Sequence, residues 1–226
     1  MIKIFHTGDI HLGMKFTSYP EGVRELLSES RYLTLESMIK KANEMNCNLF
    51  VVAGDLFNTT QVAKRDIDRT VNILDKFLGN CVLVMPGNHD YDNGMVELWK
   101  HFNSHHRENI VYLAENRAFS LEDYGLDAVV YPAHCDAKHS EDNNLAWIKN
   151  TEIAEEDKYH IGIAHGALQG ISPDLAGEYF YMGKEELEEI PVDIWLLGHT
   201  HVSYPTADNI SNWKVYNAGT PEPDGL

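Results

Sequence analysis

Five short apolar runs in this chain lead directly into polar motifs in which glycine stands beside Asp, Asn or His. The motifs are Gly8-Asp9-Ile10-His11, Gly54-Asp55, Gly87-Asn88-His89-Asp90, His165-Gly166 and Gly198-His199-Thr200-His201. Apolar runs of this length are typical of buried strands. In an open α/β sheet, ligands bind beyond the carboxyl ends of the strands. We therefore expect these Asp, His and Asn side chains to meet at one edge of a sheet.

Amphipathic segments separate the apolar runs. The runs are Ile2–Phe5, Leu49–Ala53, Cys81–Met85, Ala128–Tyr131, Ile161–Ala164 and Ile194–Leu197. Apolar residues recur every three to four positions from about Val23 to Asn46, from Ile67 to Leu78, around Leu98–Phe102 and at Leu145 and Ile148, which predicts helices there. The alternation of strands and helices predicts an α/β fold. Alternating segments within residues 110–132 predict a second sheet, and Trp213–Ala218 predicts a late strand.

Composition narrows the class of protein. The chain has 226 residues, which suits one domain over residues 1–226. Its formal net charge of -17 argues against a broad basic surface for nucleic acid. The three cysteines are widely spaced and predict neither a disulfide framework nor a cysteine metal site. We expect no signal peptide and no membrane span, and hence a cytoplasmic protein.

The donor types indicate a metal centre. Imidazole nitrogen together with carboxylate and amide oxygen suits Mn, Fe or Zn better than Mg alone. Taken singly, each motif has an ordinary explanation, because Asn and Asp favour turns and Asp-x-His can lie on a surface loop. Glycine beside each motif permits sharp turns and a close approach of the backbone. The five motifs in this order favour the metal centre over these separate explanations.

Together the motifs resemble the calcineurin-like metallophosphoesterase superfamily. The longer strings Asp9–Gly13 and Gly54–Phe57 are similar to those of one branch, which holds the bacterial SbcD nuclease and its archaeal and eukaryotic repair-nuclease relatives. The resemblance spans the chain from Phe5 to about Pro223. It implies a four-layer α/β sandwich, with two mixed β-sheets flanked by helices.

The resemblance also implies a ligand set for two divalent metal ions. One ion would be bound by Asp9, His11 and His201, the other by Asn88, His165 and His199, with Asp55 bridging them. Manganese is the metal we expect, with Fe or Zn as alternatives. Two such ions about 3.5–4 Å apart can hold a phosphoryl group and lower the pKa of a water molecule. His89 would donate a proton to the leaving group or steady the phosphate.

One position departs from the pattern of many superfamily members. They have Gly-Asp-x-x-Asp, where the second Asp orients the catalytic histidine, and this chain has Asn58 there. A neutral amide favours the imidazolium form of His89 less than a carboxylate would. The departure counts against the protein serine/threonine phosphatases, whose pattern also has Gly-Asn-His-Glu.

Three functions fit these residues. The first is a DNA exonuclease or endonuclease that acts on DNA ends with an SbcC-like ATPase subunit, and the resemblance suggests a homodimer. The second is a phosphodiesterase or phosphatase for small molecules, such as nucleotides or cyclic nucleotides. The third is a binding scaffold without turnover. Because the chain ends soon after Gly198–His201, the capping and ATPase-binding parts of the repair nucleases are expected to lie outside it.

Other side chains leave alternatives open. His101, His105 and His106 lie near a predicted helix end, where helix-dipole or solvent-facing roles compete with adventitious metal binding. Tyr179, Phe180 and Tyr181 could stack on bases or pack within a loop. Four basic residues, which are Lys64, Arg65, Arg69 and Arg107, could contact phosphate or cover a solvated helix face.

Overall fold

A computed structural model describes residues 1–153, 158–172, 174, 176–206 and 214–223. In its first half, strands and helices alternate as expected. They are β1 (Ile4–Thr7), α1 (Glu21–Glu44), β2 (Leu49–Ala53), α2 (Lys64–Leu74), β3 (Cys81–Met85), α3 (Glu97–His105) and β4 (Ile110–Tyr112). The strands form a sheet in the order β1-β2-β3-β4. Every described pairing in it is parallel, because each connection between its strands contains a helix.

The second half forms a five-stranded sheet in the order β5-β6-β7-β8-β9. Its elements are β5 (Phe119–Ser120), the 3-10 turn Glu122–Tyr124, β6 (Ala128–Ala133), α4 (Ala146–Lys149), β7 (Tyr159–His165), α5 (Lys184–Glu189), β8 (Ile194–Gly198) and β9 (Val215–Asn217). Only β5 is antiparallel to its neighbour among the described strands. The α/β architecture of two sheets flanked by helices is confirmed, although only the second sheet is mixed in the described residues.

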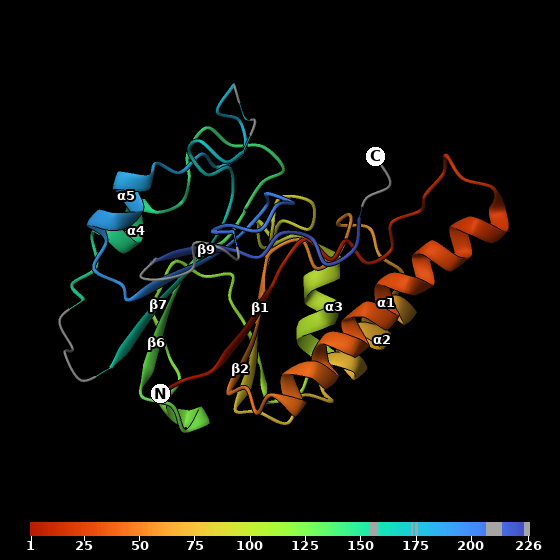
Figure 1. Ribbon diagram of the computed structural model, residues 1–226, viewed down its shortest axis with the longest axis horizontal. Helices are drawn as coiled ribbons and strands as arrows, with labels where there is room; N and C mark the ends of the chain where they lie inside the picture. The colour runs from red at the N-terminus through yellow and green to blue at the C-terminus, as the bar shows by residue number, and fades with distance from the viewer. Residues whose placement is uncertain (154–157, 173, 175, 207–213, 224–226) are drawn as a thin grey trace.

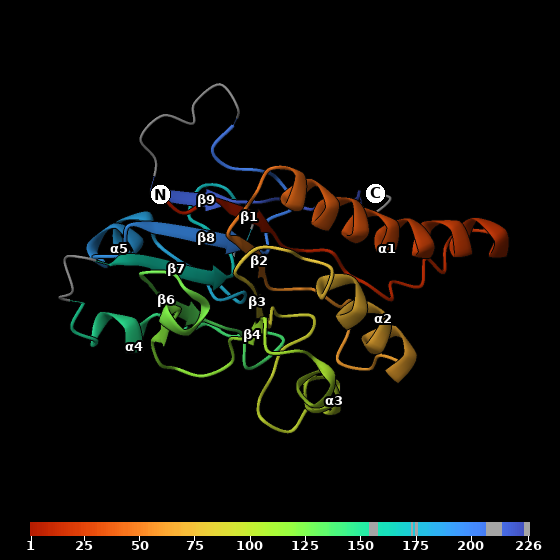
Figure 2. The same ribbon diagram turned by 90° about the horizontal axis from the view of Figure 1, so that it is seen from below.

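The two sheets pack face to face, and helices cover both outer faces (Figures 1 and 2). Helices α1, α2 and α3 lie against the first sheet, while α4 and α5 lie against the second. Three hydrophobic clusters fill the spaces between these four layers. The central cluster joins the sheets and contains side chains from β2, β3, β6 and β7.

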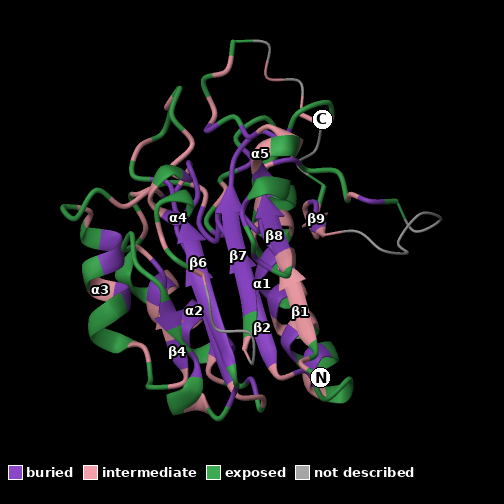
Figure 3. Cartoon of the chain, turned by 90° about the vertical axis from the view of Figure 1, so that its left-hand side faces the viewer, coloured by how far each residue is buried: buried purple, intermediate pink, exposed green. Residues whose placement is uncertain are grey.

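Strand β2 shows why its sequence is apolar throughout. Phe50 and Val52 point into the cluster under the helices, whereas Leu49, Val51 and Ala53 point into the cluster between the sheets. Side chains alternate across a strand, so a strand covered on both faces needs apolar residues at every position. Figure 3 shows this burial along the inner strands and the exposed outer faces of the helices.

The element boundaries differ modestly from expectation. The helix expected to reach Leu78 ends at Leu74, and Leu78 is 83% exposed beyond it. Of the expected strand Trp213–Ala218, the structure shows Val215–Asn217, and Trp213 lies outside the described residues. No helix in the described part of the chain has the length and apolar character needed to cross a bilayer.

Candidate metal centre

The polar motifs meet where the carboxyl ends of strands from both sheets come together. In the first sheet, the amide of Asp9 donates a hydrogen bond to the carbonyl oxygen of Gly54, 3.1 Å away. Across the sheets, Nδ1 of His165 lies 2.8 Å from the carbonyl oxygen of Ala53. These bonds tie the ends of β1, β2 and β7 into one edge, as the placement of the motifs predicted.

Glycine makes this close approach possible. Gly54 has φ +87°, and a Cβ atom there would overlap the imidazole of His165. A Cβ atom at Gly198 would overlap the carbonyl oxygen of Ala53. Only a residue without a side chain fits at either position, because the overlapping atoms belong to packed backbone or to a buried histidine.

Four of the seven expected ligands have left-handed backbones. The φ angles are 51° at Asp9, 51° at His11, 52° at Asp55 and 90° at His199. Positive φ is uncommon for residues other than glycine, and it costs of order 1–3 kcal/mol at each position. The surrounding structure holds these residues in an unfavourable conformation that turns their side chains into the centre.

The first expected set of ligands converges at the ends of β1 and β8. The Nε2 atoms of His11 and His201 are 3.3 Å apart, and Nε2 of His201 is 3.7 Å from an oxygen of Asp9. Asp9 is fully buried, and both of its carboxylate oxygens accept hydrogen bonds from the backbone amide of His199. The side chain of His201 is 39% exposed, so this set faces solvent on one side.

The second expected set surrounds the side-chain oxygen of Asn88. That oxygen lies 3.1 Å from Nε2 of His165 and 3.1 Å from Nδ1 of His199. The three donors come from the ends of three different strands, β3, β7 and β8. Their convergence gives a compact group of two imidazoles and one amide oxygen.

Asp55 lies between the two sets. One of its carboxylate oxygens is 3.4 Å from Nε2 of His165 and 3.8 Å from Nε2 of His11. Its other oxygen accepts a hydrogen bond from the backbone amide of His89 at 2.8 Å. The carboxylate is therefore oriented on one side and faces both donor sets on the other.

The electrostatics of the edge are those of a site suited to positive charge. Burial raises the pKa of Asp9 to about 7. Burial alone would lower the pKa of His165, but the nearby Asp55 carboxylate raises it to about 9. Burial, together with repulsion from His165, lowers the pKa of His199 to about 3. The carboxylates and imidazoles thus shift one another's pKa, and a bound cation would compete with protons for the imidazole nitrogens.

These donors fit two divalent cations. Each set offers three N or O donors of the kinds that borderline transition metals prefer, and a shared carboxylate lies between the sets. A buried cluster of this polarity is costly unless it is paired or coordinates a metal. Two bound ions would neutralise the charge of the acidic groups and accept the lone pairs of the imidazole nitrogens.

His89 lies at the open side of the centre. Its ring is 4.8 Å from that of His11 in an edge-to-face arrangement. Its Nδ1 is 3.2 Å from the backbone carbonyl oxygen of Asn58. The departure at position 58 therefore matters less than its side chain suggests, because the orienting contact comes from the main chain. With Nδ1 donating to that oxygen, Nε2 is the ring nitrogen left to act on a substrate.

Asp90 supports the centre, although it is not one of the expected ligands. Its buried carboxylate accepts hydrogen bonds from the backbone amides of Phe57 at 2.9 Å and Gly87 at 2.7 Å. Its carbonyl oxygen accepts a hydrogen bond from the indole of Trp99. Asp90 thereby joins the loops that carry Asp55 and His89. Its place in Gly-Asn-His-Asp was the available signal.

The rim of the centre contains Tyr179. Its ring stacks on His199 with centroids 5.3 Å apart, while Phe180 is buried in the loop. Tyr179 lines a cavity of about 490 Å³, together with Asn88, His89, Ser172, Asp174, Ala176 and His199. The basic candidates are elsewhere: Arg65, Arg69 and Arg107 pair with Asp66, Glu29 and Asp75 respectively.

Comparison with known proteins identifies the fold and the family. The family model for calcineurin-like phosphoesterases matches residues 2–203. The chain belongs to this family. Members of the family typically bind divalent metals, and membership suggests metal-dependent hydrolysis of phosphoesters. The resemblance inferred from the motifs is confirmed at the level of the superfamily.

Two relatives illustrate the match. The chain is 26% identical over 210 residues to an uncharacterized metallophosphoesterase, YhaO, of Bacillus subtilis strain 168. That alignment covers 88% of this chain and 48% of the relative, so the chain spans about half of that protein's length. The crystal structure of TT1561 from Thermus thermophilus superposes with a TM-score of 0.56 at 13% identity, covering 98% of this chain and 91% of that chain. This likeness supports the fold.

Proposed function

We propose that the protein is a binuclear phosphodiesterase. The observation that carries this proposal is the position of Asp55. Its carboxylate faces His11 of one donor set and His165 of the other, 3.8 and 3.4 Å away. A carboxylate in such a place can bridge two cations, which together would activate water and stabilise charge on a phosphoryl group.

The chain's own residues then divide the remaining tasks. Nδ1 of His89 donates to the carbonyl oxygen of Asn58, so Nε2 is the nitrogen left to act on the leaving alkoxide, and it has a proton to give when the ring is an imidazolium. Asp90 positions His89 and Asp55 by accepting hydrogen bonds from both of the loops that carry them. The exposed side of His201 leaves the centre open to a substrate.

For the substrate we propose DNA, cleaved in the manner of the SbcD-type repair nucleases. The strings Asp9–Gly13 and Gly54–Phe57 support this branch, and Tyr179 at the rim offers a ring on which a base could stack. Manganese is the proposed metal. An SbcC-like ATPase subunit and a second copy of the chain are the proposed partners, and the cytoplasm is the proposed compartment.

A small-molecule phosphodiesterase is the second candidate, and the charge distribution favours it. The described residues that line the 490 Å³ cavity include Asp174 and none of the chain's lysines or arginines. A net charge of -17 also opposes binding of a polyanion. A nucleotide or cyclic nucleotide carries far less charge than DNA and would meet less repulsion.

An activity panel separates the candidates. Metal-free protein receives zero, one or two equivalents of Mn²⁺ and is then tested on linear duplex DNA, single-stranded DNA, a cyclic nucleotide and an aryl phosphodiester. We expect hydrolysis that requires the second equivalent, and degradation of DNA. Hydrolysis of the aryl ester or cyclic nucleotide without DNA degradation would support the second candidate. Full activity with one equivalent would contradict a binuclear centre.

A further inference from the structure

A second cluster of metal-ligand side chains lies between α2 and α3, away from the strand ends. It consists of Asp68 on α2 with His101 and His105 on α3. A carboxylate oxygen and one ring nitrogen from each histidine all lie within 4.8 Å of one another. The two histidines are four residues apart, so they share one face of the helix. Their rings stack with centroids 4.0 Å apart.

The hydrogen bonds of His105 select the tautomer that binds metal through Nε2. Its Nδ1 lies 2.8 Å from the carbonyl oxygen of His101 and 2.8 Å from the hydroxyl of Ser104. The Ser104 hydroxyl itself donates to the same carbonyl. Nδ1 of His105 is therefore a donor, and the lone pair is on Nε2. Histidine ligands usually donate their other ring N–H to a backbone carbonyl or a carboxylate in this way.

His101 and Asp68 are already in contact. Nε2 of His101 lies 2.8 Å from a carboxylate oxygen of Asp68. Two donors on a tetrahedral zinc ion are about 3.4 Å apart, since each metal–ligand bond is about 2.0–2.2 Å. The side chain of Asp68 is 45% exposed, so its carboxylate can move outward by the difference. A cation would then replace the shared proton, which is the usual exchange when a metal binds imidazole.

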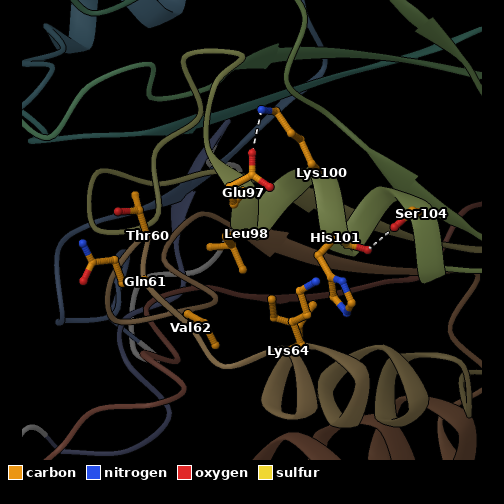
Figure 4. Close-up of a pocket in the computed structure, with 10 residues that line it drawn as sticks. Thr60, Gln61, Val62, Lys64, Glu97, Leu98, Lys100, His101 and Ser104 are labelled. Atoms are coloured by element: carbon orange, nitrogen blue, oxygen red, sulfur yellow. Dashed lines mark hydrogen bonds and ion pairs between the residues drawn. The ribbon is translucent and has the colours of Figure 1, made fainter.

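Solvent reaches the cluster, because His105 is exposed and the side chain of Asp68 is partly exposed, so a water molecule has access as a fourth ligand. Figure 4 shows His101 extending from α3 toward α2 at the edge of a cavity of about 380 Å³. Lys100 points away from this ring and pairs with Glu97 at 2.8 Å. Lys64 lines the same cavity and is exposed, so its charge opposes a bound cation but can turn into solvent.

We propose that Asp68, His101 and His105 form a separate binding site for a single Zn²⁺-like transition metal ion, with water as the fourth ligand. Two imidazoles and one carboxylate are a donor set that suits Zn²⁺. The ion would connect α2 to α3 on the outer surface of the first sheet. The site is independent of the phosphoesterase centre and shares no residue with it.

Counting bound zinc tests the proposal. The whole chain is dialysed against buffered Zn²⁺, and metal content is measured for the wild type and for His105→Ala, Asp68→Asn and His106→Ala. The first two variants should each bind one equivalent less than the wild type, or bind that equivalent at least about tenfold more weakly. His106→Ala removes a neighbouring histidine outside the cluster and should keep the wild-type count. All of these positions are at least partly exposed, so the variants should fold.

Two further results bear on the outcome. Zn²⁺ should raise the melting temperature of His106→Ala by more than that of His105→Ala, because only the former retains the link between helices. Lys64→Ala should tighten zinc binding at the site, since it removes an opposing charge. Equal zinc content in the wild type and His105→Ala would overturn the proposal, and the cluster would then be a hydrogen-bonded helix contact alone.

Discussion

The protein contains two clusters of Asp and His side chains that differ in how they are built. The strand-end centre, which is the set from Asp9 to His201 described above, is mostly buried and contains several left-handed backbones. The helix-face cluster, which is Asp68, His101 and His105, lies on ordinary helices and is at least partly exposed at every position. Similar donor types therefore occur in two very different environments.

The difference shows what burial and strain add to a set of ligands. In the strand-end centre, burial raises the pKa of Asp9 to about 7, and Asp55 raises that of His165 to about 9. Charges interact strongly there because water is excluded. At the helix face, solvent screens the same kinds of group. We expect the first cluster to govern catalysis and the second to affect only local stability.

The largest effect should come from Asp55 of the strand-end centre, with Asp68 of the helix-face cluster as its control. Asp55→Ala removes the carboxylate that faces both donor sets, so turnover should fall by more than about 10⁴-fold and bound Mn²⁺ should drop below two equivalents. Asp68→Ala should leave turnover unchanged and lose only peripheral zinc. Steady-state kinetics and metal analysis measure both. Asp55→Ala with turnover within about tenfold of the wild type would remove the distinction between the clusters.

The next effect concerns His89, which contacts the centre without belonging to either expected donor set. His89→Gln should lower turnover by about 10²–10⁴-fold, because it removes the general acid, and metal content should stay at the wild-type level. His106→Gln, at a partly exposed histidine, serves as the control for activity. His11, Asp55 and His89 are also close enough to hold an ion together. A parallel loss of metal and turnover would therefore make His89 a ligand instead of an acid.

A smaller effect concerns the free energy of unfolding, and it compares a glycine at the close-packed strand ends with a glycine in an open loop. Gly54 and Gly94 both have positive φ, +87° and +82°, but a Cβ atom would overlap His165 at Gly54 and would contact nothing within 4 Å at Gly94. Alanine at Gly94 carries only the backbone cost, of order 1 kcal/mol. Gly54→Ala adds overpacking, typically a further ~1–3 kcal/mol. Urea unfolding gives both free energies, and equal losses would show that the strand ends are not close-packed.

The sequence anticipated the strand-end centre because parallel strands present their carboxyl ends at one edge. All eight expected side chains, His89 included, are brought together there. The backbone geometry was not predicted: Asp and His are enriched among residues with positive φ, but the sequence does not show which of them adopt it, as Asp9 and His199 do. The contact between His89 and the main chain at Asn58 was also hidden, since a side-chain pattern carries no information about carbonyl positions.

The helix-face cluster was only half visible in the sequence. His101 and His105 are four residues apart near the end of a predicted helix, so the sequence predicts that they share one face of it. Asp68 is 33 residues away from His101 and joins them only because α2 and α3 pack side by side. Periodicity predicts which face a residue occupies but not which helix covers that face. Tertiary packing, which the sequence pattern leaves open, supplied the third donor.

The smallest effect concerns the pH dependence of stability, and it compares a histidine whose ring nitrogen is buried with an exposed histidine. The Nε2 atom of His6 on β1 is buried, and burial lowers the pKa of this histidine to about 4, below its ordinary value of 6.5. The unfolded chain therefore binds this proton at a higher pH than the folded chain. The contribution of His6 to stability is full above its unfolded pKa and declines as the pH falls toward its folded pKa. By about pH 5 the decline should be about 1–2 kcal/mol.

Comparison of His6→Gln with His105→Gln isolates this contribution. The free energy of unfolding is measured at about pH 8 and about pH 5 for both variants and the wild type. His6→Gln should show a smaller decline than the wild type by about 1–2 kcal/mol, because glutamine does not titrate. His105→Gln replaces a histidine on the exposed side of α3 and serves as the matched control for the substitution itself. If the free energy of unfolding declined equally in all three proteins, the folded chain would tolerate an imidazolium at His6. Burial would then not lower the pKa of His6 as expected.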